Sequence, residues 1–431
     1  MSYLFVFRVG PDIDHITPLA WKLIQEGEEV HAIISPGYDP ASDHRLRFLA
    51  GFERFHLHEV DRRPRGRSKL ARLWADVSTI ARGSLPFTLL LLLRHRVRVV
   101  GVEWGYGLPA GFGRLRSPTG WAAVARSLAR SLVRSARRDP HQPRVNAIVG
   151  ARLLDRPVVC LPHGLSIKTD TAPNEQLVAA VREGTLDYSD RNHFTAYVLN
   201  TEFNRRFYVD QAKLDPQVLQ SWGSLRWSPE WFAINRDLVA PWAWPDDDDA
   251  RLKVVMMVPK WVNRVDGPAV VELVARLQDL DFVSLALKGH PRGNLGKPDP
   301  LRTDPRIRWD ALHDVGKVDS VALIGAADVV LDVGSSIGLE VVLQEKLLVN
   351  PTYVHEPKTL FDAIPGSCVV AHDADAVVEA LEAAAAGRAP QPDADALREL
   401  LRRAVYADRP EPFDVLGYYA GRFRELASAG G

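Results

Sequence analysis

Three short groups of polar residues each follow an apolar run of strand length. They are residues 331–340 (LDVGSSIGLE), residues 286–292 (ALKGHPR) and residues 161–170 (LPHGLSIKTD). In doubly wound sheets, ligands bind beyond the carboxyl ends of the strands. The placement of the three groups therefore predicts a ligand site built from the loops that follow strands.

The group at 331–340 has the residue types of a phosphate site. Gly334 allows close approach to the backbone, and Ser335 and Ser336 offer hydroxyl and N–H groups where a helix is expected to begin. Free amides and the helix dipole favour an anion there. Glu340, one turn further on, could accept hydrogen bonds from ribose hydroxyls. The alternative is ordinary capping of the helix by serine.

The group at 286–292 places three potential donors within five residues: Lys288, His290 and Arg292. Such a turn could hold a diphosphate and stabilise the charge on it as it departs. The alternative is a basic surface loop. Lys260 follows another expected strand and is predicted to face the same site.

The group at 161–170 contains His163, which could act as a general base near neutral pH. Lys168 would then be available to an anionic acceptor or donor. The alternative for His163 is a buried histidine with a structural hydrogen bond. Asp14 and His15, beside Asp12 in the expected loop after the first strand, are weaker candidates for the acceptor side or for helix caps.

No residue spacing indicates a metal site. The two cysteines, Cys160 and Cys368, lie in apolar runs, and neither an HExxH nor a paired-cysteine pattern occurs. We therefore expect no metal, and the cysteine usage favours a reducing compartment.

Short apolar runs alternate with longer segments of helical period. The chain opens with expected strands at Tyr3–Val9 and Glu29–Ile34 around a helix at Thr17–Gln25. A second series begins at Leu252–Val258 and includes Val329–Val333. This alternation predicts the α/β class with parallel sheets.

The length of 431 residues favours two domains. We expect an N-terminal Rossmann-like domain at 1–240, with a basic helical insertion at about 62–138, and a linker at 241–250 (PWAWPDDDDA). A C-terminal domain is expected at 251–405, followed by a helical segment at 406–431 that packs back toward the N-terminal domain.

Net charge is zero, but residues 62–138 hold 17 lysines and arginines against two acids. This asymmetry predicts contact with something anionic, and the alternative is a solvated arginine-rich surface. The basic region and the apolar run Pro86–Leu93 within it would then rest together on an anionic membrane. The chain lacks a secretory signal and a long apolar span, so we expect a cytoplasmic protein, peripheral on the inner face of the membrane. The basic region lacks interleaved aromatic residues suited to base stacking, so we expect no nucleic acid partner.

The motifs PHGLSIK, AYVLNTEFNRRFYV, WGSLRWSPEW, LKGHPR and DVVLDVGSSIGLEVVLQEKLLVNPTY occur in that order. This arrangement resembles CDP-glycerol glycerophosphotransferase-like proteins, and also bacterial capsule and lipopolysaccharide glycosyltransferases, including those that use CMP-Kdo. The resemblance covers roughly residues 150–360, with a looser GT-B-like start at FRVGPDIDHITPLAWKLIQEGEEV.

The resemblance implies a GT-B fold of two Rossmann-like, doubly wound domains facing across a cleft. It implies a transferase that moves a glycosyl or glycerophosphoryl group from a CDP-, CMP- or UDP-linked donor to a cell-surface glycan or lipid-linked acceptor, without a cofactor. His163 would activate the acceptor. His290, Ser335 and Ser336 would hold the donor phosphates, and Glu340 would bind the ribose.

The turn Asp332–Ser336 (DVGSS) departs from the Asp-Tyr-Ser-Ser type of the glycerophosphotransferases, which favours a sugar donor. Two alternatives stay open. A nucleotide-sugar 2-epimerase would share the fold and the Ser-Ser loop, although its Arg-Pro-Glu-type turn after the first strand is absent. A non-catalytic nucleotide-sugar-binding protein would bind without turnover.

Overall fold

The computed structural model describes residues 1–61, 69–104, 128–131, 133–135, 137–169, 175–245, 251–258, 260–290 and 298–429. The chain forms two compact units. The first comprises Met1–Gly164, Asp187–Ser228 and Pro412–Gly431, and the second comprises Leu165–Leu186 and Pro229–Glu411.

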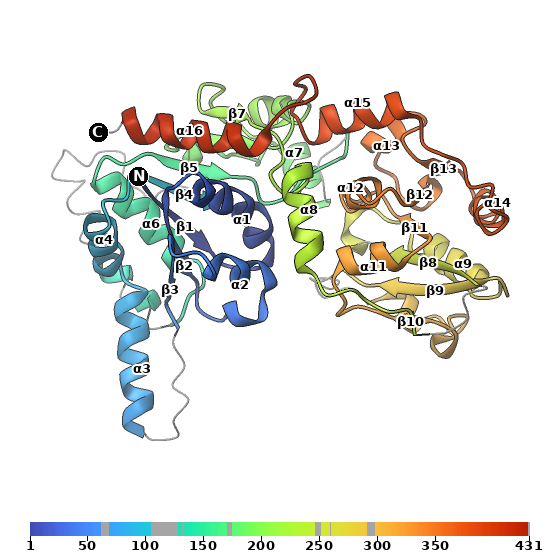
Figure 1. Cartoon of the computed structure of the whole chain (residues 1–431), viewed down its shortest axis with the longest axis horizontal. Helices are drawn as coiled ribbons and strands as arrows, with labels where there is room; N and C mark the ends of the chain where they lie inside the picture. The colour runs from blue at the N-terminus through green and yellow to red at the C-terminus, as the bar shows by residue number, and fades with distance from the viewer. Residues whose placement is uncertain are drawn as a thin grey trace. The chain divides into compact units, whose positions relative to one another are not determined.

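The first unit is built on a seven-stranded parallel sheet (Figure 1). Its strands are β1 (Ser2–Phe7), β2 (Glu29–Ile34), β3 (Phe55–Glu59), β4 (Val99–Glu103), β5 (Val158–Leu161), β6 (Ala196–Leu199) and β7 (Leu219–Ser221). They lie in the order β3-β2-β1-β4-β5-β6-β7, so the direction of winding reverses between β1 and β4.

Helices cover both faces of this sheet, which is why its central strands are mostly apolar. On one face, α4 (Leu85–Arg94) and α6 (Gln142–Leu153) pack against Leu4 and Val100. On the other, α16 (Val415–Ala429) places Phe423 against Tyr3 and Phe5, with ring centroids 6.0 and 5.7 Å apart, and contacts α1 (Gly10–Gln25). The C-terminal helix is thus part of the core of the first unit.

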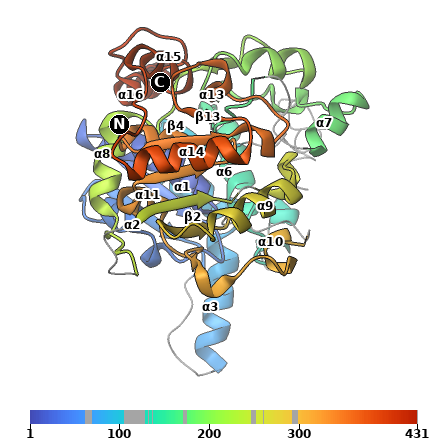
Figure 2. The ribbon, with the colours of Figure 1, turned by 90° about the vertical axis from the view of Figure 1, so that its right-hand side faces the viewer.

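The second unit is built on a six-stranded parallel sheet. Its strands are β8 (Leu252–Met257), β9 (Val283–Lys288), β10 (His313–Asp314), β11 (Val329–Asp332), β12 (Leu347–Pro351) and β13 (Val369–Ala371), in the order β10-β9-β8-β11-β12-β13. The winding reverses between β8 and β11. Two helices, α9 (Gly267–Leu277) and α14 (Ala374–Ala385), pack on one face (Figure 2). Two others, α11 (Ser320–Ala326) and α12 (Gly338–Leu343), contact β8 and β12.

The other α-helices given for the described residues are α2 (His44–Ala50), α3 (Lys69–Arg82), α7 (Glu175–Arg182), α8 (Pro229–Leu238), α10 (Pro300–Thr303), α13 (Leu360–Ala363) and α15 (Ala394–Ala404). Aspartate side chains cap several helices by accepting hydrogen bonds from the first-turn amides, at Asp43, Asp266, Asp373 and Asp393. These caps fix where the helices begin.

The expected α/β class with two Rossmann-like parallel sheets is confirmed. The stretch expected as a basic helical insertion at 62–138 differs in one respect. It contains β4, which pairs with β1 and β5 at the centre of the sheet, as well as α3 and α4. The short strand VVGVE was hidden in a region dominated by arginine.

Within the described residues, no single helix is long and apolar enough to cross a membrane. One pair, 76–82 with 85–94, passes on length and composition when the two helices are taken together, but it is bent by 61°.

Candidate active site

Ionisable side chains from three strand ends meet in the first unit. Glu103 is the last residue of β4 and is completely buried, and Asp12 lies in the first turn of α1 at 1% exposure. His163 lies two residues after β5, and its side chain is 15% exposed. Its Nδ1 atom contacts Oε1 of Glu103 and lies 4.0 Å from Oδ1 of Asp12.

Two arginines compensate the two buried carboxylates. Arg8 places Nη2 at 3.4 Å from Oε2 of Glu103 and Nε at 3.6 Å from Oδ2 of Asp12. Arg144 places Nη1 at 3.6 Å from Oε2 of Glu103. Burying a charge is costly unless it is paired, so these contacts make the cluster tolerable in the core.

The backbone beside Glu103 is strained. Trp104 adopts φ +32°, a left-handed conformation that bulky residues rarely occupy. Arg144 Nη1 donates to the carbonyl oxygens of Glu103 and Trp104, at 2.9 and 3.0 Å, and the Trp104 amide donates to Leu161 O at 3.0 Å. Such strain persists only where the surroundings enforce it, and it concentrates at functional sites.

Charge and burial shift two pKa values around the cluster. Burial raises the pKa of Asp12, and the charge and hydrogen bonds of Arg8 only partly oppose this. Burial also lowers the pKa of His141, and Arg8 and Arg144 lower it further. A neutral His141 can accept a hydrogen bond from Arg8, whose Nη1 lies 3.2 Å from its Nδ1. His141 therefore orients Arg8.

This arrangement suits proton transfer. A carboxylate beside Nδ1 favours the proton on that nitrogen, and the ring then carries its lone pair on Nε2, as a general base requires. Asp12, Glu103 and His163 also bring three ligand atoms within 4.8 Å of one another, as a metal site would. Because Arg8 and Arg144 already face the carboxylates, a further cation would be repelled.

The other residues expected on the acceptor side make their contacts elsewhere. Asp14 lies in α1 rather than a loop and forms ion pairs with Arg45 and with Arg226, whose Nη1 is 3.2 Å away. His15 is buried and its ring forms a T-shaped pair with the ring of Trp227. Lys168 belongs to the second unit, where it forms a β-bridge with Thr359.

The turn after β11 in the second unit is organised by a buried carboxylate. Asp332 accepts hydrogen bonds from the amide and the hydroxyl of Ser335, at 3.1 and 2.6 Å. The Ser335 hydroxyl accepts in turn from the Ile337 amide at 3.2 Å, and Gly334 supplies φ +62°. Burial raises the pKa of Asp332 to about 7, with Glu340 adding and the Ser335 hydrogen bonds opposing.

Two residues expected at the phosphate or ribose have inward-facing partners. Lys288 is buried, and its ammonium donates to the carbonyl oxygens of Gly316 and Val318 at 3.2 and 2.5 Å. Burial lowers the pKa of Lys288, opposed by the charges of Asp319 and Glu340. Glu340 is also buried and accepts from the Ser320 hydroxyl at 3.2 Å.

The remaining expected phosphate residues lie in loops after neighbouring strands. His290 follows β9, Lys260 follows β8, and Ser336 follows β11. The strands β9, β8 and β11 are adjacent and parallel, with β8 between the other two. These loops therefore all leave the sheet at the carboxyl ends of its strands. The winding reverses between β8 and β11, and ligands usually bind beyond the carboxyl ends of the strands at such a reversal. Arg292 lies outside the described residues.

A pocket of about 550 Å³ opens at the same carboxyl end of the second sheet. Its lining residues follow β8 and β12 or belong to α7: Arg264, Val265, Asp266, Tyr353, His355, Glu356, Val178, Ala179 and Arg182. A Cβ atom on residue 334 would lie 3.1 Å from the ring of His355. The Gly334–Ser336 turn therefore adjoins a wall of the pocket.

Sequence reasoning missed four charged residues of the two sites: Arg8, Glu103, Arg144 and, as the organiser of its turn, Asp332. The signal that could have found the two acids is a single carboxylate at the end of an apolar run, as in VVGVE and VVLD. A buried acid at a strand end must have partners, whereas an exposed one need not. No comparable local signal marks the arginines.

No family model and no curated protein matches the sequence. Several solved structures match it over nearly its whole length. A structure from Listeria monocytogenes, assigned as a UDP-N-acetylglucosamine 2-epimerase, aligns with a TM-score of 0.54 at 9% identity, over 99% of this chain and 96% of that chain. A further UDP-N-acetylglucosamine 2-epimerase aligns with a TM-score of 0.53 at 10% identity, over 98% and 94%.

The UDP-GlcNAc 2-epimerase from Neisseria meningitidis, bound to UDP-GlcNAc, aligns with a TM-score of 0.51 at 11% identity, and all of both chains is covered. At such low identity these similarities define the fold alone. Together with the two parallel sheets, they show that the chain has the GT-B fold.

Proposed function

We propose that this protein is a GT-B enzyme that acts on a nucleotide-linked sugar and that His163 transfers the proton in its reaction. The observation that carries this proposal is the contact of His163 with Glu103 at a strand end of the first unit. A buried carboxylate that holds one ring nitrogen is the arrangement by which histidine becomes an oriented general base.

The second unit supplies the features expected of a nucleotide-phosphate site. Its pocket adjoins the Gly334–Ser336 turn and has exposed Arg182 on its α7 side. His290 and Lys260 would add positive charge or hydrogen-bond donors from the neighbouring loops. We assign Lys288 and Glu340 a structural role at the carboxyl end of the second sheet, because their described hydrogen bonds go to protein groups. The donor-binding role expected for residues 251–405 remains part of this proposal.

Two reactions would use a histidine base of this kind and a nucleotide-linked sugar. Epimerisation of the sugar at carbon 2 is favoured by the solved structures of the same fold, which include an epimerase bound to UDP-GlcNAc. Transfer of a sugar or glycerophosphate to a glycan or lipid-linked acceptor is favoured by the order of motifs in the sequence. His163 would take a proton from carbon in the first case and from an acceptor hydroxyl in the second.

One experiment separates these reactions. The protein is incubated in D₂O with UDP-GlcNAc, other UDP-sugars, GDP-sugars, CMP-Kdo and CDP-glycerol in turn, with and without a lipid-linked acceptor, and thermal shift, NMR and nucleotide release are followed. Epimerisation gives deuterium at carbon 2 of the sugar, with no acceptor needed. Transfer releases the nucleotide in proportion to the acceptor consumed.

The outcomes bear on different parts of the proposal. A thermal shift without either product would indicate a binding protein and remove the catalytic role of His163. No shift with any compound of the panel would refute the nucleotide-linked substrate itself.

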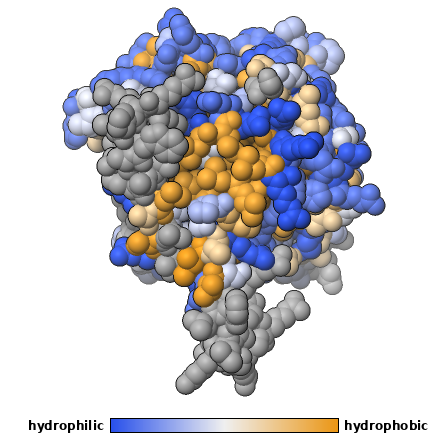
Figure 3. All heavy atoms as spheres, turned by 90° about the vertical axis from the view of Figure 1, so that its left-hand side faces the viewer, coloured by the Kyte–Doolittle hydropathy of each residue, from blue (hydrophilic) through white to orange (hydrophobic). Residues whose placement is uncertain are grey.

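We also propose that the surface of α4 rests on an anionic membrane. Leu90, Leu93 and Val133, which we call the α4 patch, are 60%, 58% and 54% exposed, and Figure 3 shows hydrophobic residues gathered on this side of the molecule. Ser131 accepts from the Leu85 amide and so holds the segment of Val133 beside α4. Exposed arginines accompany the patch at Arg94, Arg130, Arg134 and Arg137. Each basic residue near an anionic surface contributes about 1 kcal/mol.

A further inference from the structure

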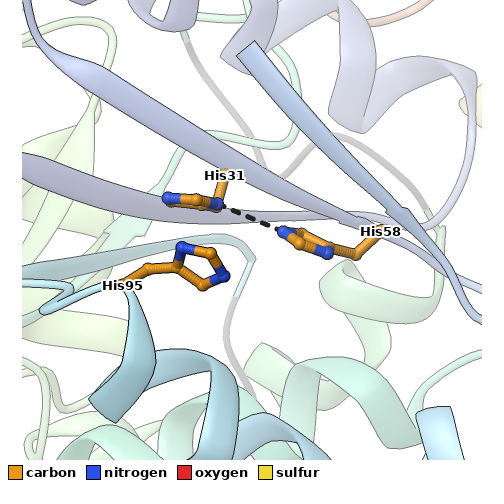
Figure 4. A group of neighbouring side chains, drawn as sticks. All are labelled: His31, His58 and His95. Atoms are coloured by element: carbon orange, nitrogen blue, oxygen red, sulfur yellow. Dashed lines mark hydrogen bonds between the residues drawn. The ribbon is translucent and has the colours of Figure 1, made fainter. Parts of the chain in front are cut away.

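Three histidines that are distant in the sequence converge on one face of the first sheet (Figure 4). His31 lies in β2, His58 lies in β3 and His95 caps the C-terminus of α4. Each offers a ring nitrogen, and these three atoms lie within 4.8 Å of one another. Nδ1 of His31 is 3.1 Å from Nε2 of His58, and the rings of His31 and His95 have centroids 4.2 Å apart.

The topology of the fold explains this convergence. His31 pairs with Leu4 in register, so its side chain lies on the sheet face that α4 covers. His31 of β2 pairs in register with His56 of β3. His58 lies two residues after His56, so its side chain is on the same face. Side chains of alternate strand residues share a face, so both β3 histidines stand beside β2. The end of α4 brings His95 against them.

We propose that His31, His58 and His95 form a binding site for a divalent transition metal of the Zn²⁺ type. Three imidazoles with an open fourth position are a recurrent zinc ligand set. Two nitrogens bound tetrahedrally to zinc at the usual bond length are about 3.3 Å apart. The separation of 3.1 Å between His31 and His58 is close to this value.

The surroundings of the three rings suit a cation. His56 stacks on His31 with centroids 4.7 Å apart and lies 2.7 Å from the carboxylate of Glu29 through Nε2. The carboxylate of Glu29 provides nearby negative charge without entering the three-histidine set.

A metal bound at this position would stabilise the fold. β3 is the edge strand of the sheet, and it is held by β2 on one side only. A metal bound by residues of β2, β3 and α4 would tie that edge strand to the helix beneath it. Binding to the folded state alone raises its stability.

The test uses full-length protein without a histidine tag, stripped of metal with a chelator and titrated with Co²⁺ as a spectroscopic probe and then with Zn²⁺. We expect one equivalent of Co²⁺ with the visible bands of tetrahedral coordination, displacement by Zn²⁺, and a raised Tm. His58→Gln and His95→Gln should weaken binding by more than the roughly 10- to 100-fold that loss of an outer-sphere partner costs.

His163→Gln is the matched control, because it alters the other cluster able to hold a metal and should leave binding unchanged. Circular dichroism of each metal-free variant checks that it is folded. X-ray absorption of the wild-type zinc complex should show three imidazoles, a readout that needs no variant. The proposal is overturned by absence of binding, by binding lost only in His163→Gln, or by a coordination shell without imidazole.

Discussion

His163 and Glu103 lie 60 residues apart in the sequence, yet Nδ1 of the histidine contacts Oε1 of the completely buried carboxylate. Each residue ends or follows a strand, and β4 and β5 are neighbours in the sheet. The carboxylate is in turn held by Arg8 and Arg144, so the histidine is fixed to a network rather than to a single partner. This network is the basis of the first two predictions.

Replacing His163 with alanine should strongly reduce turnover and leave nucleotide affinity within a few fold of wild type. Loss of a general base typically costs about 10²- to 10⁴-fold in rate. The measurement is kcat on the substrate found in the D₂O panel, together with the thermal shift by the same compound. His372→Ala, which alters an exposed histidine of the second unit, should keep full activity. Equal kcat in both variants would rule out proton transfer by His163.

Glu103→Gln should destabilise the first unit. Removing one partner from a buried ion-pair network leaves Arg8 and Arg144 short of negative charge, and such losses cost about 3–5 kcal/mol. Urea unfolding monitored by circular dichroism gives the free energy of unfolding. Glu183→Gln, at an exposed position, should change that free energy by no more than about 0.5 kcal/mol. A wild-type unfolding curve for Glu103→Gln would contradict the view that this network stabilises the fold.

Asp332 should make stability fall as pH rises. Its folded pKa of about 7 lies above the ordinary value of 3.8, so between these values the folded state binds more protons than the unfolded state. Its contribution is therefore full below pH 4 and is lost as pH approaches 7, by at most about 4 kcal/mol. Asp332→Asn should remove this dependence.

The measurement is Tm as a function of pH for the wild type and for Asp332→Asn. The difference between the two curves should move in favour of the variant from pH 5 to pH 7. Parallel curves would show that Asp332 does not titrate in this range.

Gly334→Ala should lower stability and weaken nucleotide binding together. The residue has φ +62°, and the new Cβ would stand 3.1 Å from the His355 ring. The left-handed conformation alone costs about 1–2 kcal/mol for a residue with a side chain. Gly289→Ala is the control, since a Cβ there meets nothing within 4 Å. Thermal unfolding with and without nucleotide compares the two variants, and an unchanged nucleotide-induced shift in Gly334→Ala would separate this turn from the binding site.

Leu90→Glu combined with Leu93→Glu should release the protein from anionic vesicles. The double change removes two exposed apolar side chains and adds two negative charges to the α4 patch. Flotation with phosphatidylglycerol and with phosphatidylcholine vesicles measures the effect. Gln391→Glu with Ala394→Glu adds the same charge at exposed positions of the second unit and should bind as the wild type does. Binding that is insensitive to lipid charge or to the Leu90 and Leu93 changes would refute the membrane contact.

The sequence alone predicted the α/β class and many of its strands, because a buried parallel strand is a continuous apolar run and a turn signal ends it. Glu29–Ile34 and Ala196–Leu199 are examples in which the run and the strand coincide. It also pointed to His163 and to the turn at Ser335, because each lies directly after such a run. β4 was missed because arginine-rich neighbours concealed a strand of five residues.

The tertiary structure decided which side chains meet. Parallel strands bring their carboxyl ends to one edge whatever their separation along the chain, and only the strand order tells which ends are adjacent. For this reason Glu103 contacts His163, while Asp14 forms ion pairs with Arg45 and Arg226. His31, His58 and His95 converge for the same reason, since strand pairing and the end of a helix, rather than sequence spacing, set their distances.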